Sequence, residues 1–122
     1  MVDLEMIGSI LESRDEERMQ RWEQHVKDGL DARISMCNLH YTCMLKKVMF
    51  GVYVMIFVRS DCQQNVHQLQ TVKVKTGVKG YAANKGAVSL RFNYDDTSFM
   101  LLNCHLTSGQ SKTKQRLDDI SQ

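Results

Sequence analysis

Several features that identify a class of proteins are missing from this chain of 122 residues. Proline is absent, although average usage of about 5% would give roughly six. The four cysteines contain no C-x-x-C pair, which excludes zinc ribbons and fingers that need ligands at short spacing. Basic and acidic residues nearly balance, 16 against 14, so bulk charge does not indicate nucleic acid or an anionic membrane.

Long apolar runs are also missing. The longest covers residues 48–58, far short of the about 20 residues of a membrane-spanning helix. Residues 1–5 carry Asp3 and Glu5 without a basic stretch, so we expect no signal peptide. Because most of the cysteines sit in or beside apolar stretches, we expect buried, reduced thiols in a cytosolic protein.

The first part of the chain, residues 1–36, has the apolar spacing of helices. Trp22 and Val26 lie on one stripe at helical period. The S-x-x-E sequence that begins at Ser13 has the form of a capping box, so one long helix and two helices remain alternatives. We interpret the charged run 14–18 as a solvated face.

Residues 40–106 are rich in predicted strands, and residues 112–122 are predicted to form a closing helix. The strand-like runs are 41–48, 51–58, 72–78, 87–92 and 99–106. A short helical turn is predicted within 62–70. This order predicts a layered α+β or α/β domain with mostly antiparallel strands. Helices at the two ends alone would leave one sheet face uncovered, so we expect association or a larger domain.

The segment 75–86, K-T-G-V-K-G-Y-A-A-N-K-G, concentrates glycine and lysine. Glycine lets backbone approach a ligand and lysine supplies charge, so phosphate recognition is one hypothesis. The segment is neither a Walker A loop nor a dinucleotide-binding fingerprint. Its G-x-x-G at 77–80 matches the loop of nucleotide-clamping KH domains. A solvated connection between strands is the remaining alternative.

His105 ends an apolar strand and opens a Thr-Ser-Gly turn. An imidazole there suits proton transfer or a hydrogen bond to a phosphoryl oxygen, and the alternative is a structural histidine bonded to its own turn. Antiparallel pairing through the turn at 93–98 predicts Phe92 opposite Phe99 and Gly86 opposite His105. We interpret Asp118-Asp119 as a helix surface.

Residues 71–92 and 98–119 together resemble the inositol polyphosphate 5-phosphatase family. The first matches its T-G-x-x-G-x-x-G-N-K-G-A-V-x-x-R-F segment, and the second its C/S-H-L-x-A-G segment with a following helix. The second match consists of Cys104, His105, Leu106, Gly109, Arg116 and Asp119. The chain departs from the pattern at Ala83 and at Thr107-Ser108, where small residues replace small residues.

The resemblance implies a fold and an activity. It implies part of a four-layer α/β sandwich of the endonuclease/exonuclease/phosphatase type, with 1–122 as a single partial domain. The implied activity is that of a phosphoric monoester hydrolase, which removes the 5-phosphate from a phosphoinositide or soluble inositol phosphate with Mg²⁺. The metal ligands and general base are expected outside this chain, so we expect the isolated chain to bind no metal and to be inactive.

The resemblance also implies roles for individual residues. His105 would be catalytic and would bond the scissile phosphoryl group. Substrate phosphates would be bound through Gly80, Asn84, Lys85 and Gly86. Lys75 and Lys79 would add diffuse attraction. The implied partners are the remainder of the domain and a cytoplasmic, peripheral membrane surface, with no nucleic acid.

Two other functions remain as alternatives. The first is a non-catalytic module that binds inositol phosphates without turnover. The second is a nucleic-acid-binding or nuclease-like domain that uses the G-x-x-G loop.

Overall fold

The computed structural model describes residues 4–76 and 85–121, beginning with one long helix. Helix α1 spans Leu4–Ile34, and a 3₁₀ turn at Ser35–Cys37 follows it. Ser13 lies inside α1, so of the two alternatives the single long helix is confirmed. Among the described residues, no helix is long and apolar enough to cross a membrane.

Two antiparallel strands form the first sheet. They are β1 (Tyr41–Met49) and β2 (Val52–Arg59), joined by a tight turn at Phe50 and Gly51. Both turn residues have positive φ, +42° and +77°, which is the backbone that tight hairpins matching the strand twist require. A glycine at the second position takes up this conformation without a side-chain clash.

Three antiparallel strands form the second sheet, in the order β3 (Val66–Lys75), β4 (Gly86–Tyr94) and β5 (Thr97–His105). The predicted register is confirmed, because Phe92 pairs with Phe99 and Gly86 pairs with His105. Helix α2 (Thr113–Ile120) closes the described chain.

Strand β3 begins earlier than predicted. The 3₁₀ helix η2 occupies Ser60–Asn65, and the strand starts at Val66 where a helical turn was expected to continue. The polar residues of this stretch favoured a helical turn over a strand in the prediction. The strand is irregular there, since its register shifts between His67 and Gln70 and Gln68 has a φ of +54°. Val66 itself is buried in the core, and this anchors the start of the strand.

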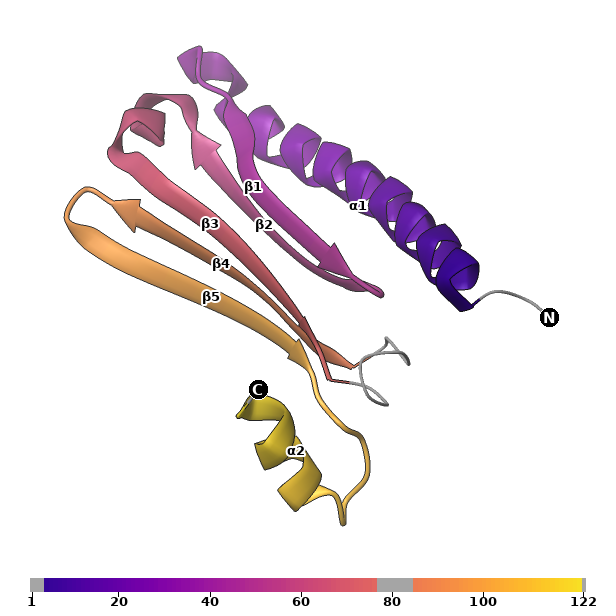
Figure 1. The fold of residues 1–122 in the computed structure, drawn as a ribbon. Helices are drawn as coiled ribbons and strands as arrows, with labels where there is room; N and C mark the ends of the chain where they lie inside the picture. Colours follow the sequence, from indigo (N-terminus) through magenta and orange to yellow (C-terminus); the bar gives the residue numbers. More distant parts are fainter. Residues whose placement is uncertain (1–3, 77–84, 122) are drawn as a thin grey trace.

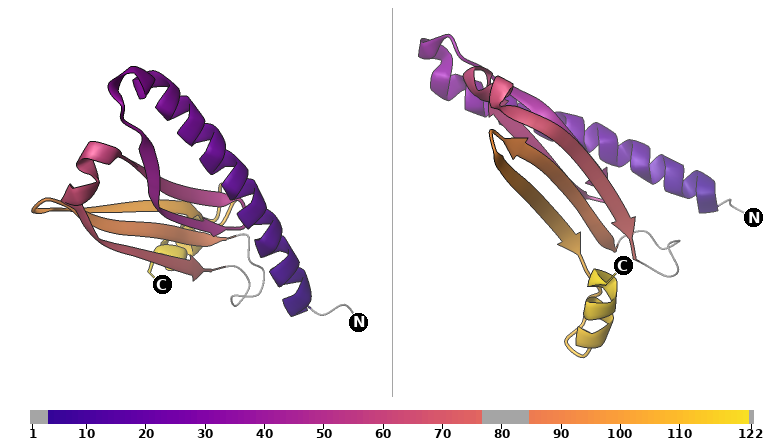
Figure 2. Two further views of the ribbon diagram at one scale, coloured as in Figure 1. Left: turned by 90° about the horizontal axis from the view of Figure 1, so that it is seen from above. Right: turned by 60° about the vertical axis from the view of Figure 1, so that its left-hand side comes forward.

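The structure is layered, with the hairpin β1–β2 between α1 and the three-stranded sheet (Figure 1). Figure 2 shows the same arrangement from two further sides. The core lies between the two sheets and is built on Ile56, Val58, Val66 and Leu90. Val88 and Leu90, two residues apart on β4, are both completely buried, as the strand period of two predicts. The mixed helix and antiparallel-sheet fold predicted from the sequence is confirmed.

Strand β5 lies at the edge of its sheet without a cover in the described structure. All nine of its residues are exposed, and the side chain of Met100 is 66% accessible. An uncovered apolar sheet face was expected from the sequence. The expectation of buried cysteines is wrong, since Cys104 on β5 and Cys37 are exposed, and Cys43 and Cys62 are half-buried. All four are free thiols.

Asp15 is an exception to the solvated face that was predicted for residues 14–18. Its side chain is buried, and its carboxylate accepts a hydrogen bond of 2.7 Å from the backbone N–H of Gly51. A hydrogen bond from the strained turn to α1 fixes the hairpin tip against the helix. The acid is therefore a structural link between the first layer and the second.

We predict that Asp15→Ala lowers the free energy of unfolding by about 1–3 kcal/mol, because the backbone N–H of Gly51 loses its charged acceptor. Glu17→Ala, at an exposed position of the same helix, serves as the matched control and changes stability by less than about 0.5 kcal/mol. Urea unfolding of both variants tests this. Equal stability of the two variants would contradict the assigned link.

Candidate functional site

Lys85 and His105 meet at one corner of the three-stranded sheet. Lys85 immediately precedes β4 and His105 is the last residue of β5, so the pairing of Gly86 with His105 brings them together. Lys85 Nζ lies 2.8 Å from His105 Nε2. An ammonium can only donate, so Nε2 accepts and the imidazole carries its proton on Nδ1. We call this pair the Lys85–His105 corner.

A backbone hydrogen bond connects the two ends of the glycine-rich segment. The backbone N–H of Thr76 donates to the carbonyl oxygen of Lys85 at 3.0 Å, directly beyond the β3–β4 ladder. Lys85 is half-buried and His105 is exposed, so both polar groups are accessible from solvent. A cation and an imidazole at hydrogen-bond distance can together bind an anionic oxygen. Gly80, Asn84 and Lys79 lie outside the described residues, and their assignments stay predictions.

Gly86 has a structural role that the sequence did not predict. It is buried and lies beside strand β3, and its implied part in binding a substrate phosphate stays a prediction. Its φ is +147°, and a Cβ at this position would lie 2.0 Å from the carbonyl oxygen of Val74. Glycine therefore permits the close approach of β3 and β4 immediately beside the corner.

Lys75 also has a different environment from the one expected. Its ammonium donates to Glu12 Oε1 at 2.9 Å and lies 5.1 Å from the ring centre of Phe50. Lys73 contacts the same oxygen at 3.1 Å. Hydrogen bonds from Lys75 first, and then from Lys73, lower the pKa of Glu12. Lys75 thus links α1 to β3. Because Lys73 and Lys75 share the one carboxylate of Glu12, the three groups together keep a net positive charge, and the diffuse attraction that the resemblance implies for Lys75 stays a prediction.

The backbone beyond His105 is held by helix α2. The N–H and hydroxyl of Thr107 donate to Asp119 Oδ2, at 3.0 and 2.7 Å. The hydroxyl bond first, and then the amide bond, lower the pKa of Asp119, with a smaller contribution from the charge of Lys85. This stabilisation is present above the unfolded pKa of about 3.9 and is lost as the pH falls through the lowered folded value.

Asp119 was interpreted as helix surface, and this was wrong. Its carboxylate contacts the turn that follows His105. Arg116, on the same helix, donates to the carbonyl oxygen of Gly109 at 2.7 Å. Both residues belong to the resemblance quoted above, but residue spacing alone does not show that α2 folds back onto this turn. The resemblance was the signal that could have placed them at the site.

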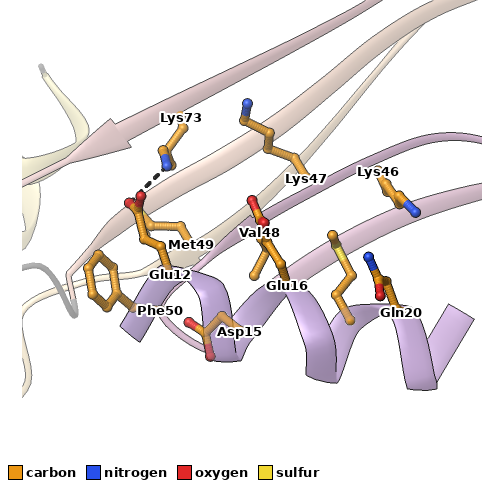
Figure 3. Close-up of a pocket in the computed structure, with 11 residues that line it drawn as sticks. Glu12, Asp15, Glu16, Gln20, Lys46, Lys47, Val48, Met49, Phe50 and Lys73 are labelled. Carbon is orange, nitrogen blue, oxygen red and sulfur yellow. Dashed lines mark hydrogen bonds and ion pairs between the residues drawn. The ribbon is translucent and has the colours of Figure 1, made fainter. Parts of the chain in front are cut away.

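A hollow lies between α1 and β1, with a volume of about 320 Å³ (Figure 3). Its lining carries both signs of charge, from Glu12, Glu16, Lys46, Lys47 and Lys73. Glu12 pairs with Lys73, and Lys46 pairs with Glu23, so much of this charge is neutralised internally. For that reason we take the Lys85–His105 corner, and not this hollow, as the candidate site.

Comparisons with known proteins agree on one family. Residues 3–122 match the model of endonuclease/exonuclease/phosphatase family 2. The chain is 35% identical over 100 residues to a probable inositol polyphosphate 5-phosphatase of Schizosaccharomyces pombe, covering 82% of this chain. It is 36% identical over 112 residues, 92% of the chain, to a polyphosphatidylinositol phosphatase of Saccharomyces cerevisiae.

A solved structure is similar as well. The inositol polyphosphate 5-phosphatase domain of SPsynaptojanin, in complex with inositol (1,4)-bisphosphate and a calcium ion, matches with a TM-score of 0.70 and 29% identity. The match covers 83% of this chain but 29% of that chain. The chain also spans only 8% and 10% of the length of the two yeast relatives.

We predict opposite effects of alanine at two glycines. Gly86→Ala destabilises the protein by more than about 1 kcal/mol, because of its positive φ and the clash with Val74. Gly29→Ala, inside α1 with nothing within 4 Å of the new Cβ, stabilises by about 0.5–1 kcal/mol. Thermal unfolding of both variants measures this. A Gly86→Ala protein as stable as wild type would refute the close approach of β3 and β4.

Proposed function

The chain belongs to endonuclease/exonuclease/phosphatase family 2, and we propose that it forms the phosphate-recognition part of a domain that removes the 5-phosphate from phosphoinositides or inositol polyphosphates. The names of its relatives support this substrate class. So does the inositol (1,4)-bisphosphate bound in the similar solved structure.

The contact between Lys85 and His105 is the observation that carries the proposal. Phosphoryl transfer depends mainly on positioning and on stabilising negative charge at phosphate oxygens. In this proposal an incoming phosphate oxygen takes the Lys85 ammonium as a donor. The ammonium has three N–H donors, so it keeps its contact with His105 Nε2, and His105 donates its Nδ1–H to the scissile phosphoryl group as charge develops there. His105 is the catalytic residue, since it touches the reacting group.

Other residues enter the proposal with less structural support. Asn84 adds an amide donor to a substrate phosphate, Gly80 leaves room for the ligand, and Lys79 adds diffuse positive charge. Their support is the match of the sequence to the family motif, because they lie outside the described residues. Gly86 contributes by letting β3 and β4 approach, which sets the position of Lys85.

The complete domain is proposed to use a divalent cation, and Mg²⁺ is the ion we propose. The calcium ion in the similar solved structure supports a divalent ion. Within residues 4–76 and 85–121, no three His, Cys, Asp or Glu side chains gather to hold one. These residues do not fit a metal site, so we assign the ligands elsewhere in the domain.

The remainder of the domain and a lipid surface are the proposed partners. A phosphoinositide substrate is held in a bilayer, so we propose a cytoplasmic enzyme that acts at the membrane periphery. The exposed apolar strand β5 supports a partner within the domain, since exposed large side chains gather on it.

We predict that Lys85→Gln weakens binding of inositol (1,4)-bisphosphate to the chain by about tenfold or more, because a charged hydrogen bond contributes about 1.5–3 kcal/mol. Lys114→Gln is the matched control, because it removes the same charge from an exposed position on α2. Isothermal titration calorimetry measures the three affinities.

Two outcomes would overturn the proposal. One is equal affinity of the Lys85→Gln and Lys114→Gln variants for inositol (1,4)-bisphosphate. The other is salt-dependent binding of single-stranded RNA in the absence of inositol phosphate binding, which would favour the nucleic-acid alternative.

A further inference from the structure

We propose that Asp119 and Arg116 of α2 are positioning residues, which hold the turn after His105 and thereby keep the imidazole in contact with Lys85. The ligand in this inference rests on the proposed function. Its geometric part concerns the Lys85–His105 corner alone and can be tested without a ligand.

The first step concerns what fixes the end of β5. The paired ladder between β4 and β5 stops at Gly86 and His105, so the sheet does not hold the backbone beyond that pair. Thr107, two residues further, donates both its amide and its hydroxyl to one oxygen of Asp119. Hydrogen bonds to a carboxylate are short and strong, and here they take the place of the missing ladder.

The second step concerns the far side of the turn. Arg116 lies three residues before Asp119, and therefore on the same face of α2. Its Nη1 donates to the carbonyl oxygens of Gly109 at 2.7 Å and Thr107 at 3.4 Å. Gly109 has a φ of +116°, a backbone conformation that favours glycine. The guanidinium thus binds two carbonyl oxygens of a turn whose shape depends on this glycine.

The third step concerns charge. The hydroxyl bond and then the amide bond from Thr107 lower the pKa of Asp119, with smaller contributions that include the charge of Lys85. These interactions favour the ionised carboxylate, which is the form that accepts both bonds from Thr107.

Stabilisation of α2 does not explain the position of Asp119. It lies in the last turn of the helix, where the helix dipole disfavours a negative charge. The favourable contacts of the carboxylate are with Thr107, outside the helix. The carboxylate of Asp119 therefore lies at an unfavourable position in α2, and its hydrogen bonds to Thr107 hold the turn.

Nuclear magnetic resonance on the 122-residue chain tests the proposal. The ¹⁵N shifts of the His105 ring, at a pH at which it is neutral, report which nitrogen carries the proton. We expect the proton on Nδ1 in the wild type and in Asp118→Asn, an exposed matched control on the same helix. In Asp119→Asn and in Arg116→Lys we expect both tautomers to be populated, because Nε2 is no longer held against Lys85.

Affinity for inositol (1,4,5)-trisphosphate, which carries the 5-phosphate that His105 contacts in the proposed function, provides the second readout. We expect Asp119→Asn and Arg116→Lys to weaken it about threefold to tenfold relative to Asp118→Asn, as for loss of an ordinary hydrogen bond. Should Asp119→Asn fail to fold, Thr107→Val takes its place with the same readouts, since it removes only the hydroxyl bond.

The proposal is overturned if folded variants keep both the wild-type tautomer and the wild-type affinity. Absence of inositol trisphosphate binding by the wild type would count against the proposed function instead. In that case the tautomer comparison still decides the positioning claim.

Discussion

The antiparallel register between β4 and β5 is the constraint on which the site depends. Because Gly86 pairs with His105, the residue before β4 and the last residue of β5 occupy the same corner. A shift of one residue would turn His105 to the other face of the sheet and separate it from Lys85. The tight turn at Asp95 and Asp96, across which Tyr94 pairs with Thr97, opposes such a shift, because the turn type and loop length fix the register of a hairpin.

A small number of polar contacts connect helices α1 and α2 to the two sheets. Glu12 of α1 binds Lys73 and Lys75 of β3, and Asp15 of α1 binds the turn of the β1–β2 hairpin. Near the other end of the site, Asp119 of α2 binds the turn after β5. The links from Asp15 and Asp119 reach backbone N–H groups in turns, where ladder partners are missing. Acidic side chains on the two helices thus fix the ends of the sheets.

Part of the site could be predicted from the sequence, because the strand period and the turn between β4 and β5 are local patterns. Alternation placed Val88 and Leu90 on one buried face, and counting from the turn placed Gly86 opposite His105. The family resemblance named the residues of the corner. Local pattern was sufficient because these contacts lie within one hairpin.

The remaining contacts join distant parts of the chain, and local pattern does not determine them. Lys75 looked like free charge because its partner Glu12 is 63 residues away in the sequence. Gly86 looked like a ligand-facing glycine because the clash with Val74 exists only when β3 pairs with β4. Asp119 looked like helix surface until α2 folded onto Thr107. Tertiary packing decided the role of each residue.

Shift mapping with inositol (1,4)-bisphosphate on the ¹⁵N-labelled chain tests the central claim most directly, that the Lys85–His105 corner binds phosphate. The account predicts that the largest amide shift changes occur at Lys85, Gly86, His105 and Thr107. Changes confined to the hollow between α1 and β1, around Lys46 and Lys47, would contradict it.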